Sequence, residues 1–171
     1  MEHPALKNEA RLHALGRHSE ANSGRTSADT EFEAVLSESL PESIVDKSFY
    51  TTVAGASHSN EDGSSRYQIL ARCGVFDTLT LKPEPENKFD PNAVAICRSD
   101  NGEQLGYLEA RLASEVTLDR GRNPNRWMAI FRHHNYDPEH GHVVGAVIYI
   151  ICLDADFVAE KEREAQAAQS N

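Results

Sequence analysis

Between residues 85 and 91, an amide, an aromatic ring and a carboxylate lie within a few positions of one another. Asn87, Phe89 and Asp90 are bracketed by Pro85 and Pro91. The prolines stiffen the segment, which lowers the entropy lost on binding a ligand. Asp90 can accept hydrogen bonds from backbone amides or from a ligand hydroxyl, and Phe89 can offer its face to a nucleobase. Local physics alone favours a structural alternative, in which Phe89 plugs the core and Asp90 caps the turn.

A second group of reactive side chains is rich in histidine and lies between residues 133 and 142. In a hairpin, His140 and His142 would share a strand face and His134 could lie across from them, an arrangement that could hold zinc. No cysteine is near, and the spacing matches no common structural zinc site. The sequence therefore favours a polar hairpin tip, and we assign no metal ligand and no cofactor. The residues concerned are His133, His134, Asp137, Glu139, His140 and His142.

Two motifs of enzymes are absent or incomplete. The stretch GASHS, which contains Ser57 and His58, lacks the second glycine of a nucleophile elbow. No GxxxxGK[ST] occurs, so the chain has no P-loop for nucleotide hydrolysis. We therefore expect a protein that is not an enzyme.

The net charge of −10 lies mostly in the flanks of the chain. Residues 1–46 carry −5 and residues 154–171 carry −3, which leaves −2 for residues 47–153. Within this nearly neutral part, four arginines form a local basic cluster in the sequence. Such a region can meet phosphates, with weak and salt-sensitive binding. The arginines are Arg120, Arg122, Arg126 and Arg132.

The cysteines and the hydropathy indicate a reduced, cytoplasmic protein. Cys73, Cys97 and Cys152 are widely spaced among apolar residues, which favours free thiols in a core. The longest apolar run, residues 143–153, suits a buried strand better than a membrane span. The N-terminal residues lack the apolar core of a signal peptide.

The elements that must position these residues are mostly strands. Helical spacing of Leu108, Leu112 and Val116 predicts one helix over 109–118, and Asn101-Gly102 predicts a hairpin turn. Many short strands with one inserted helix predict a mostly β fold, a small barrel or strongly curved sheet. The predicted strands are residues 48–56, 66–73, 75–83, 92–99, 103–108, 126–134 and 142–154.

Residues 81–116 resemble the HIRAN domain family. That family has a proline-rich loop leading to an aromatic-Asp pair, then x-Asn-Ala-(Ile/Val), a hairpin, Gly-(Tyr/His)-Leu and a helix. The chain supplies these motifs in order, and the stretch VAGASH (53–58) is similar to the family's first strand. The resemblance covers roughly residues 48–153. The matching residues are Asn87, Phe89, Asp90, Asn92, Ala93, Val94, Gly106, Tyr107 and Leu108.

The resemblance implies an OB-like β-barrel that holds the 3′ end of single-stranded DNA. Phe89 would stack on a base, and Asp90 with Asn87 would bind the terminal sugar and base. Tyr107 and Arg111 would flank the groove. Glu109 and Ala110 stand where DNA-binding members carry basic residues, and a carboxylate beside a phosphate path repels it. The arginines expected to steer phosphates are Arg120, Arg122, Arg126 and Arg132.

The sequence thus predicts a stand-alone module for DNA repair or DNA processing, without its own motor. One alternative is a protein-interaction adaptor for a separate helicase or nuclease, favoured by the acidic charge. A second alternative is a zinc-binding, hydrolase-associated domain. We expect three segments: an acidic, largely disordered extension (1–46) with a short helix over 31–40, a barrel (47–153), and a charged, frayed helical tail (154–171).

Overall fold

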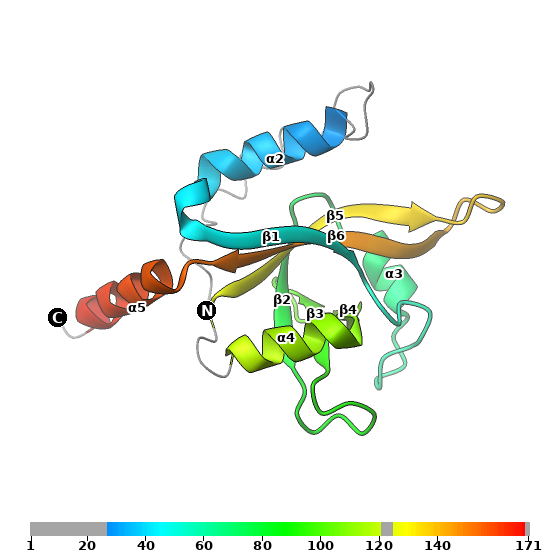
Figure 1. The fold of residues 1–171 in the computed structure, drawn as a ribbon. Helices are drawn as coiled ribbons and strands as arrows, with labels where there is room; N and C mark the ends of the chain where they lie inside the picture. The colour runs from blue at the N-terminus through cyan, green and yellow to red at the C-terminus, as the bar shows by residue number, and fades with distance from the viewer. Residues whose placement is uncertain (1–26, 121–124, 170–171) are drawn as a thin grey trace.

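Six antiparallel strands form one curved sheet in the computed structural model, which describes residues 27–120 and 125–169. The strand order is β1-β6-β5-β2-β3-β4 (Figure 1). Asn101 and Gly102 occupy the turn between β3 and β4, where Gly102 has a φ of 76°, as the sequence predicts. The strands are β1 (Val45–Thr52), β2 (Thr78–Pro83), β3 (Val94–Arg98), β4 (Gln104–Tyr107), β5 (Trp127–Tyr136) and β6 (Val143–Leu153).

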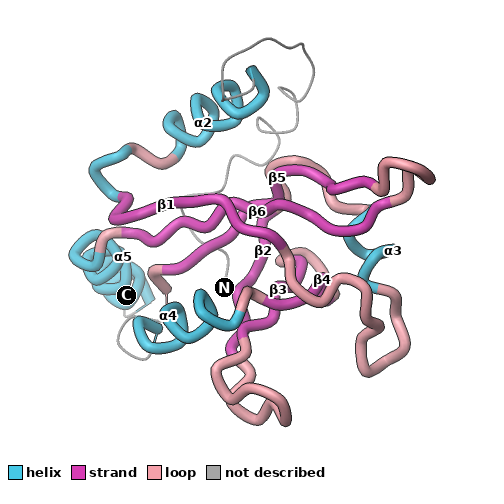
Figure 2. The backbone as a smooth tube through the Cα atoms, turned by 45° about the vertical axis from the view of Figure 1, so that its right-hand side comes forward, coloured by secondary structure: helices cyan, strands magenta, loops and turns pink. Residues whose placement is uncertain are grey.

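The two outer strands of this order meet at a short seam. Ala54, just after β1, pairs with Tyr107 at the end of β4. The amide of Ala54 donates to the Tyr107 carbonyl at 2.8 Å, and the amide of Tyr107 donates back to Ala54 at 2.9 Å. The curved sheet in Figure 2 is therefore drawn together at this point. The predicted mostly β, OB-like barrel is confirmed.

Gly106 makes the seam possible because its backbone lies against that of Ala54. A Cβ placed on Gly106 would lie 2.4 Å from the Ala54 carbonyl oxygen and 2.6 Å from Cγ1 of Val53. No side chain fits at that distance from a backbone atom. The glycine that precedes Tyr107 is thus required by the close approach of two strands.

The predicted strand over 66–73 is wrong, because these residues form helix α3 (Arg66–Ala71). The hydroxyl of Ser65 accepts a hydrogen bond from the Gln68 amide, which caps the first turn of the helix. Ile69 and Leu70 are buried. A segment of only six residues is too short for the pattern of its apolar side chains to distinguish a strand from a helix.

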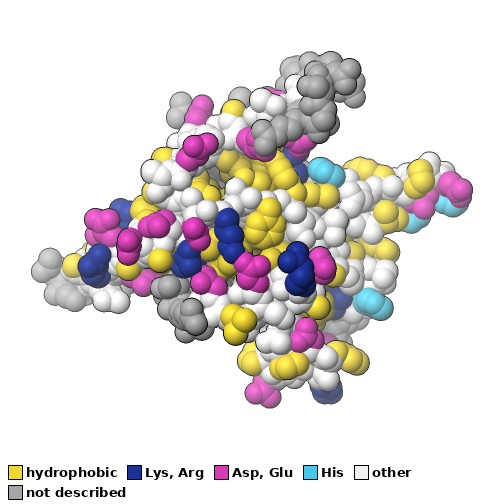
Figure 3. All heavy atoms as spheres, viewed as in Figure 1, with side chains coloured by type: hydrophobic (Ala, Val, Ile, Leu, Met, Phe, Trp, Pro, Cys, Tyr) yellow, Lys and Arg dark blue, Asp and Glu magenta, His cyan; other side chains and the backbone are white. Residues whose placement is uncertain are grey.

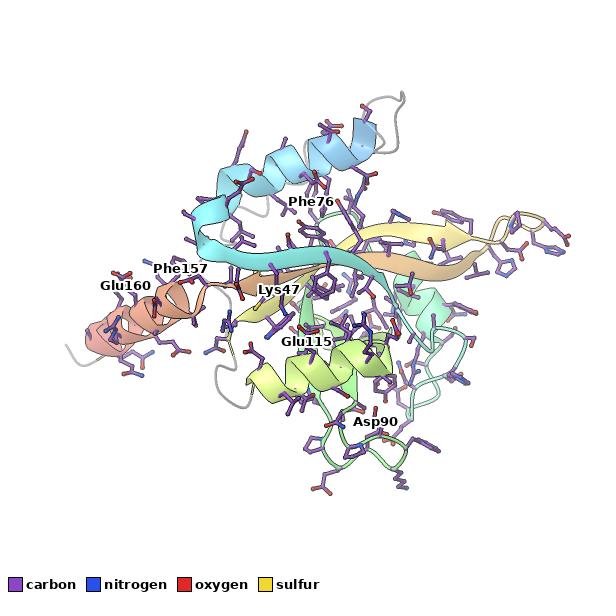
Figure 4. All side chains as sticks on the ribbon, in the orientation of Figure 1. Lys47, Phe76, Asp90, Glu115, Phe157 and Glu160 are labelled. Atoms are coloured by element: carbon purple, nitrogen blue, oxygen red, sulfur yellow. The ribbon has the colours of Figure 1, made fainter. Side chains whose placement is uncertain are left out.

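The predicted helix over 109–118 is confirmed as α4 (Ala110–Arg120). Thr117 of α4 donates to the Asn92 carbonyl at 3.2 Å, which ties the helix to the segment before β3. Lys47 of β1 forms an ion pair with Glu115 of α4, and the two side chains point toward one another in Figure 4. Helix α4 thus lies against both β1 and the β2–β3 connection.

Two apolar clusters lie on opposite faces of the sheet. The first fills the barrel, with Leu70, Ile96 and Leu105 among its members. The second lies under α2 (Ser27–Ser39) and includes Val158 of α5 (Ala155–Gln169). A short 3-10 helix, η3 (Glu42–Ile44), follows α2 in the chain and leads into β1. Both clusters draw on alternate residues of β5 and β6, as expected for a sheet that is covered on both faces.

Helix α2 begins earlier than the predicted helix over 31–40 and packs on the sheet. Phe32 is 2% exposed, stacks on Phe76 at 4.9 Å between ring centroids, and meets the edge of Tyr149. Val35 and Leu36 are also buried. The predicted extension 1–46 therefore contains a packed helix, while residues 1–26 lie outside the described part of the chain.

All three cysteines are buried free thiols, as the sequence predicts. Within residues 27–120 and 125–169, no helix combines the length and the apolar character needed to cross a membrane.

Candidate nucleic-acid interface

The loop between β2 and β3 holds its own shape through hydrogen bonds around Asn87. The Asn87 side-chain oxygen accepts from the amides of Phe89 at 3.0 Å and Asp90 at 3.2 Å. Its amide nitrogen donates to the Glu84 carboxylate at 3.0 Å. At the far side, Asp90 Oδ1 accepts from the Asn92 amide at 2.8 Å. Asn87 and Asp90 therefore both act as turn-forming side chains, one at each side of Phe89.

Phe89 projects into solvent at the tip of this loop. Its side chain is 98% exposed, so the alternative in which it plugs the core is wrong. Lys88 beside it is exposed as well. In Figure 3 the lower end of the molecule, where Figure 4 labels Asp90, shows hydrophobic, basic and acidic side chains together. A hydrophobic ring displayed on a self-braced loop is free to stack on a flat partner.

Glu84 joins the loop to the seam of the barrel. Its Oε2 accepts from the Tyr107 hydroxyl at 3.0 Å and from Asn87 at 3.0 Å. The Glu84 amide also donates to the Ala93 carbonyl at 2.8 Å, which closes the base of the loop. One carboxylate therefore connects Asn87 with Tyr107, 20 residues apart in the chain. The motif contains Asn87 and Tyr107, but nothing in its spacing indicates that Glu84 bridges them.

Arg66 is a further residue of this region that the sequence did not single out. Its guanidinium lies over the Tyr107 ring, 5.1 Å from the centroid. It donates from Nη1 to the Gly55 carbonyl at 2.9 Å and from Nε to the Asn60 side chain at 2.7 Å. Arg66 is 7% exposed. The buried cation therefore packs on a face of the Tyr107 ring, while Glu84 holds its hydroxyl.

Gly55 lies at the centre of the side chains that surround the seam. A Cβ there would meet Arg66 Nη1 at 3.2 Å, His58 Cδ2 at 3.8 Å and Tyr107 Cδ2 at 3.9 Å. His58 is exposed at this rim. Residues from three separate stretches of sequence thus converge beside Tyr107, in the part of the fold from which the Phe89 loop extends.

The predicted cationic residues are placed differently from one another. Arg111 is exposed in the first turn of α4, close in sequence to Tyr107, and Glu109 is exposed just before it. Arg120 is the last residue of α4, but its side chain lies outside the described part of the structure, as does Arg122. The loop itself carries Lys88, and Lys82 lies near the end of β2, against the carboxylates of Glu84, Glu86 and Asp90.

Arg126 is held by three partners near the start of β1. It pairs with Asp46 at 2.8 Å and with Asp119 at 3.1 Å, and it donates to the Leu153 carbonyl at 2.7 Å. Since a strand rises about 3.3 Å per residue, Asp46 lies roughly 25 Å along the strand from the seam at Ala54. The guanidinium of Arg126 is thus committed to acidic and carbonyl oxygens of the protein.

Arg132 faces α2 rather than the loop. It pairs with Asp29 at 2.7 Å, and its guanidinium lies 4.9 Å from the centroid of the Phe32 ring. Arg132 is 8% exposed, and its Nε is buried without a hydrogen-bond partner among the described residues. Arg126 and Arg132 therefore do not form a shared basic surface, because each is neutralised by carboxylates on a different element.

Comparisons with known proteins found one family model and one solved structure that resemble the chain. Residues 47–117 match the model of the HIRAN domain family. Among solved structures, the chain is similar to the crystal structure of the HIRAN domain of human HLTF, at 14% sequence identity and a TM-score of 0.48. That match covers 69% of this chain and 84% of the human one. None of the curated proteins compared with the chain matches it.

Proposed function

We propose that the protein binds the 3′ end of single-stranded DNA, because residues 47–117 match the model of the HIRAN domain family, a family of nucleic-acid-binding modules. It works without a motor of its own, as an accessory factor in DNA repair or DNA processing. The single observation that supports this most strongly is Phe89, whose side chain is 98% exposed on a loop braced by Asn87 and Asp90.

In this proposal Phe89 stacks on a base near the DNA end. Base–aromatic stacking contributes about 1–3 kcal/mol per base and tolerates any sequence, because every base has a flat face. Asp90 accepts from the terminal 3′-hydroxyl, and Asn87 holds the loop in the geometry that places both groups. Only one of the two Asp90 carboxylate oxygens is used within the loop, on the Asn92 amide, which leaves the other for a ligand hydroxyl.

The cations that meet phosphate are few. Arg111 and Lys88 are exposed, and the carboxylates of Glu86 and Glu109, which are exposed as well, offset their charge. Few neutralised phosphates predict weak binding with a shallow dependence on salt concentration. End recognition, rather than a long track along the backbone, is the mode that suits this distribution of charge.

Fluorescence anisotropy with short oligonucleotides tests the proposal. Matched strands that carry a 5′ dye and end in either a 3′-hydroxyl or a 3′-phosphate are titrated with the full chain at low and near-physiological salt. We expect tighter binding of the 3′-hydroxyl strand, since a phosphate would face the carboxylate of Asp90. Equal affinity for both strands, or no binding to either, would contradict end recognition.

Two variants assign the binding to the loop. Phe89→Ala should weaken binding by the loss of stacking, roughly 5- to 150-fold. Tyr136→Ala is the matched control, because Tyr136 is another exposed aromatic residue, 57% accessible, at the end of a different hairpin. Equal losses in both variants would show that general surface hydrophobicity, and not the loop, carries the affinity.

The acidic charge supports a second candidate function, that of an adaptor for a separate helicase or nuclease. The net charge is −10, and the exposed residues of α5 include Glu160, Glu162 and Glu164. Acidic surfaces bind basic protein partners more readily than DNA. Retention of a partner in a pull-down after nuclease treatment would favour this function, and release of everything by nuclease would contradict it.

A further inference from the structure

The loop between β5 and β6 gathers three metal-binding side chains. Asp137, His140 and His142 each offer one ligand atom, and these atoms lie within 4.8 Å of one another. The loop is the outer end of the long β5–β6 hairpin, on the right in Figure 3, where histidine and acidic side chains appear together. Its location separates it from the Phe89 loop, which leaves the sheet between β2 and β3.

Backbone hydrogen bonds keep this six-residue loop compact. The amide of Asp137 donates to the His142 carbonyl at 2.8 Å, and the amide of Gly141 donates to the Asp137 carbonyl at 2.9 Å. Gly141 has a φ of 68°, a left-handed conformation that places the two histidines on either side of a sharp turn. Pro138 further restricts the backbone. Little backbone entropy therefore remains to be lost when the three side chains converge on an ion.

The Asp137 carboxylate is oriented toward the histidines by the same turn. Its Oδ1 accepts from the amides of Glu139 at 2.9 Å and His140 at 2.7 Å, and lies 3.0 Å from Nδ1 of His140. The rings of His140 and His142 are 6.0 Å apart between centroids. Both histidines are exposed, so water can complete the coordination of an ion.

The trio differs from the one that the sequence indicated. His134 does not lie across from His140 and His142, since its Nε2 contacts the Leu70 carbonyl at 2.8 Å and its ring packs on Phe131. Asp137 takes its place. A bulge between Asn135 and Tyr136 changes the register just before the turn. A regular hairpin inferred from the sequence would not contain this bulge.

We infer that Asp137, His140 and His142 bind one divalent transition-metal ion, of which zinc is the representative. Two imidazole nitrogens and one carboxylate oxygen are ligands that suit zinc, copper and nickel. Calcium and magnesium prefer all-oxygen sites and are disfavoured here. Zinc–ligand distances are about 2.0–2.2 Å, so the donor atoms must draw closer than their present separation. Exposed side chains on a surface turn can make that movement without disturbing the core.

The cysteines do not compete for the ion in the folded protein. All three are buried, and burial raises the pKa of Cys73 and Cys152 to about 11, which keeps both thiols protonated. Cobalt therefore distinguishes the proposed site from binding to thiolates. A cobalt complex of the full chain should show visible d–d absorption without the near-ultraviolet band of sulfur-to-cobalt charge transfer.

Titration of the metal-free full chain with zinc, by calorimetry and by competition with a chromophoric chelator, tests the inference. We expect one equivalent in the wild type and affinity at least about tenfold weaker in His142→Ala and in Asp137→Asn. His133→Ala is the matched control, because His133 is exposed on the same hairpin and contacts the neighbouring His134 carbonyl. It should bind zinc like the wild type.

The inference would be overturned by the absence of saturable zinc binding, by unchanged affinity in both ligand variants, or by a sulfur charge-transfer band with cobalt. An equal loss in the His133 variant would also overturn it, since binding would then follow the number of surface histidines. The result does not depend on DNA binding, because Phe89→Ala leaves the three ligands in place.

Discussion

Replacing Gly106 with alanine should separate the two strands that close the barrel. The new Cβ would lie 2.4 Å from the Ala54 carbonyl oxygen, and neither backbone can move away without breaking the hydrogen bonds of the seam. The two hydrogen bonds between Ala54 and Tyr107 contribute about 1 kcal/mol each, and forced overpacking costs about 1–3 kcal/mol. We therefore expect a loss of about 3–5 kcal/mol in the free energy of unfolding, a large part of the 5–15 kcal/mol typical of a domain.

Urea denaturation of Gly106→Ala, of a control variant and of the wild type measures this loss. Gly74→Ala is the matched control, because its new Cβ would meet only Asp77 Oδ1, at an ordinary 3.8 Å. Amide hydrogen exchange adds a local test: the amides of Ala54 and Tyr107 should exchange faster in Gly106→Ala, whereas amides in the centre of β6 change only with global stability. If Gly106→Ala loses no more stability than Gly74→Ala, the seam does not exist as described.

Three further predictions concern the apolar face under α2, a titrating tyrosine and the only tryptophan. Phe32→Ala should cost about 3–5 kcal/mol, since Phe32 is 2% exposed, whereas Phe89→Ala should leave urea stability unchanged; equal effects would contradict the packing of α2. Burial, followed by the charge of Glu33, raises the pKa of Tyr50 to about 12, above its unfolded value of about 10. Its contribution to stability is therefore complete below pH 10 and lost as the pH rises toward 12, and Tyr50→Phe should flatten that decline in pH-dependent denaturation. Trp127→Phe should cost on the order of 1–3 kcal/mol in thermal unfolding, because it leaves the Asp119 carboxylate without the indole donor; an unchanged midpoint would mean that the bond contributes nothing.

The strands were predictable because their residue types agree with their environments. Val94 and Ile96 on β3 are buried, as are most residues in the apolar run of β6, which agrees with their apolar and mostly β-branched side chains. Helix α3 was missed because six residues carry too little periodicity to separate a helix from a strand. The cap at Ser65 was the available signal. The packing of α2 was missed because its partners, Phe76 and Tyr149, are distant in the sequence.

The site shows which part of a motif a sequence can specify. Asn87 and Asp90 are local, since each hydrogen-bonds backbone amides two or three residues away. Glu84 and Arg66 were missed because their roles depend on Tyr107, which approaches only after the barrel closes. Arg126 and Arg132, two members of the predicted basic cluster, face different parts of the fold for the same reason. Arg126 pairs with Asp46, 80 residues away in the sequence, so its neutralisation depends on the tertiary structure.

The position of Trp127 determines what an optical measurement on this protein can report. It is the only tryptophan, packs inside the barrel at 6% exposure, and has Lys47 5.0 Å above its ring. Its emission should therefore follow the opening of the barrel closely. A ligand that stacks on Phe89 cannot touch a buried indole, so tryptophan emission should not report DNA binding directly, and the dye is carried by the oligonucleotide.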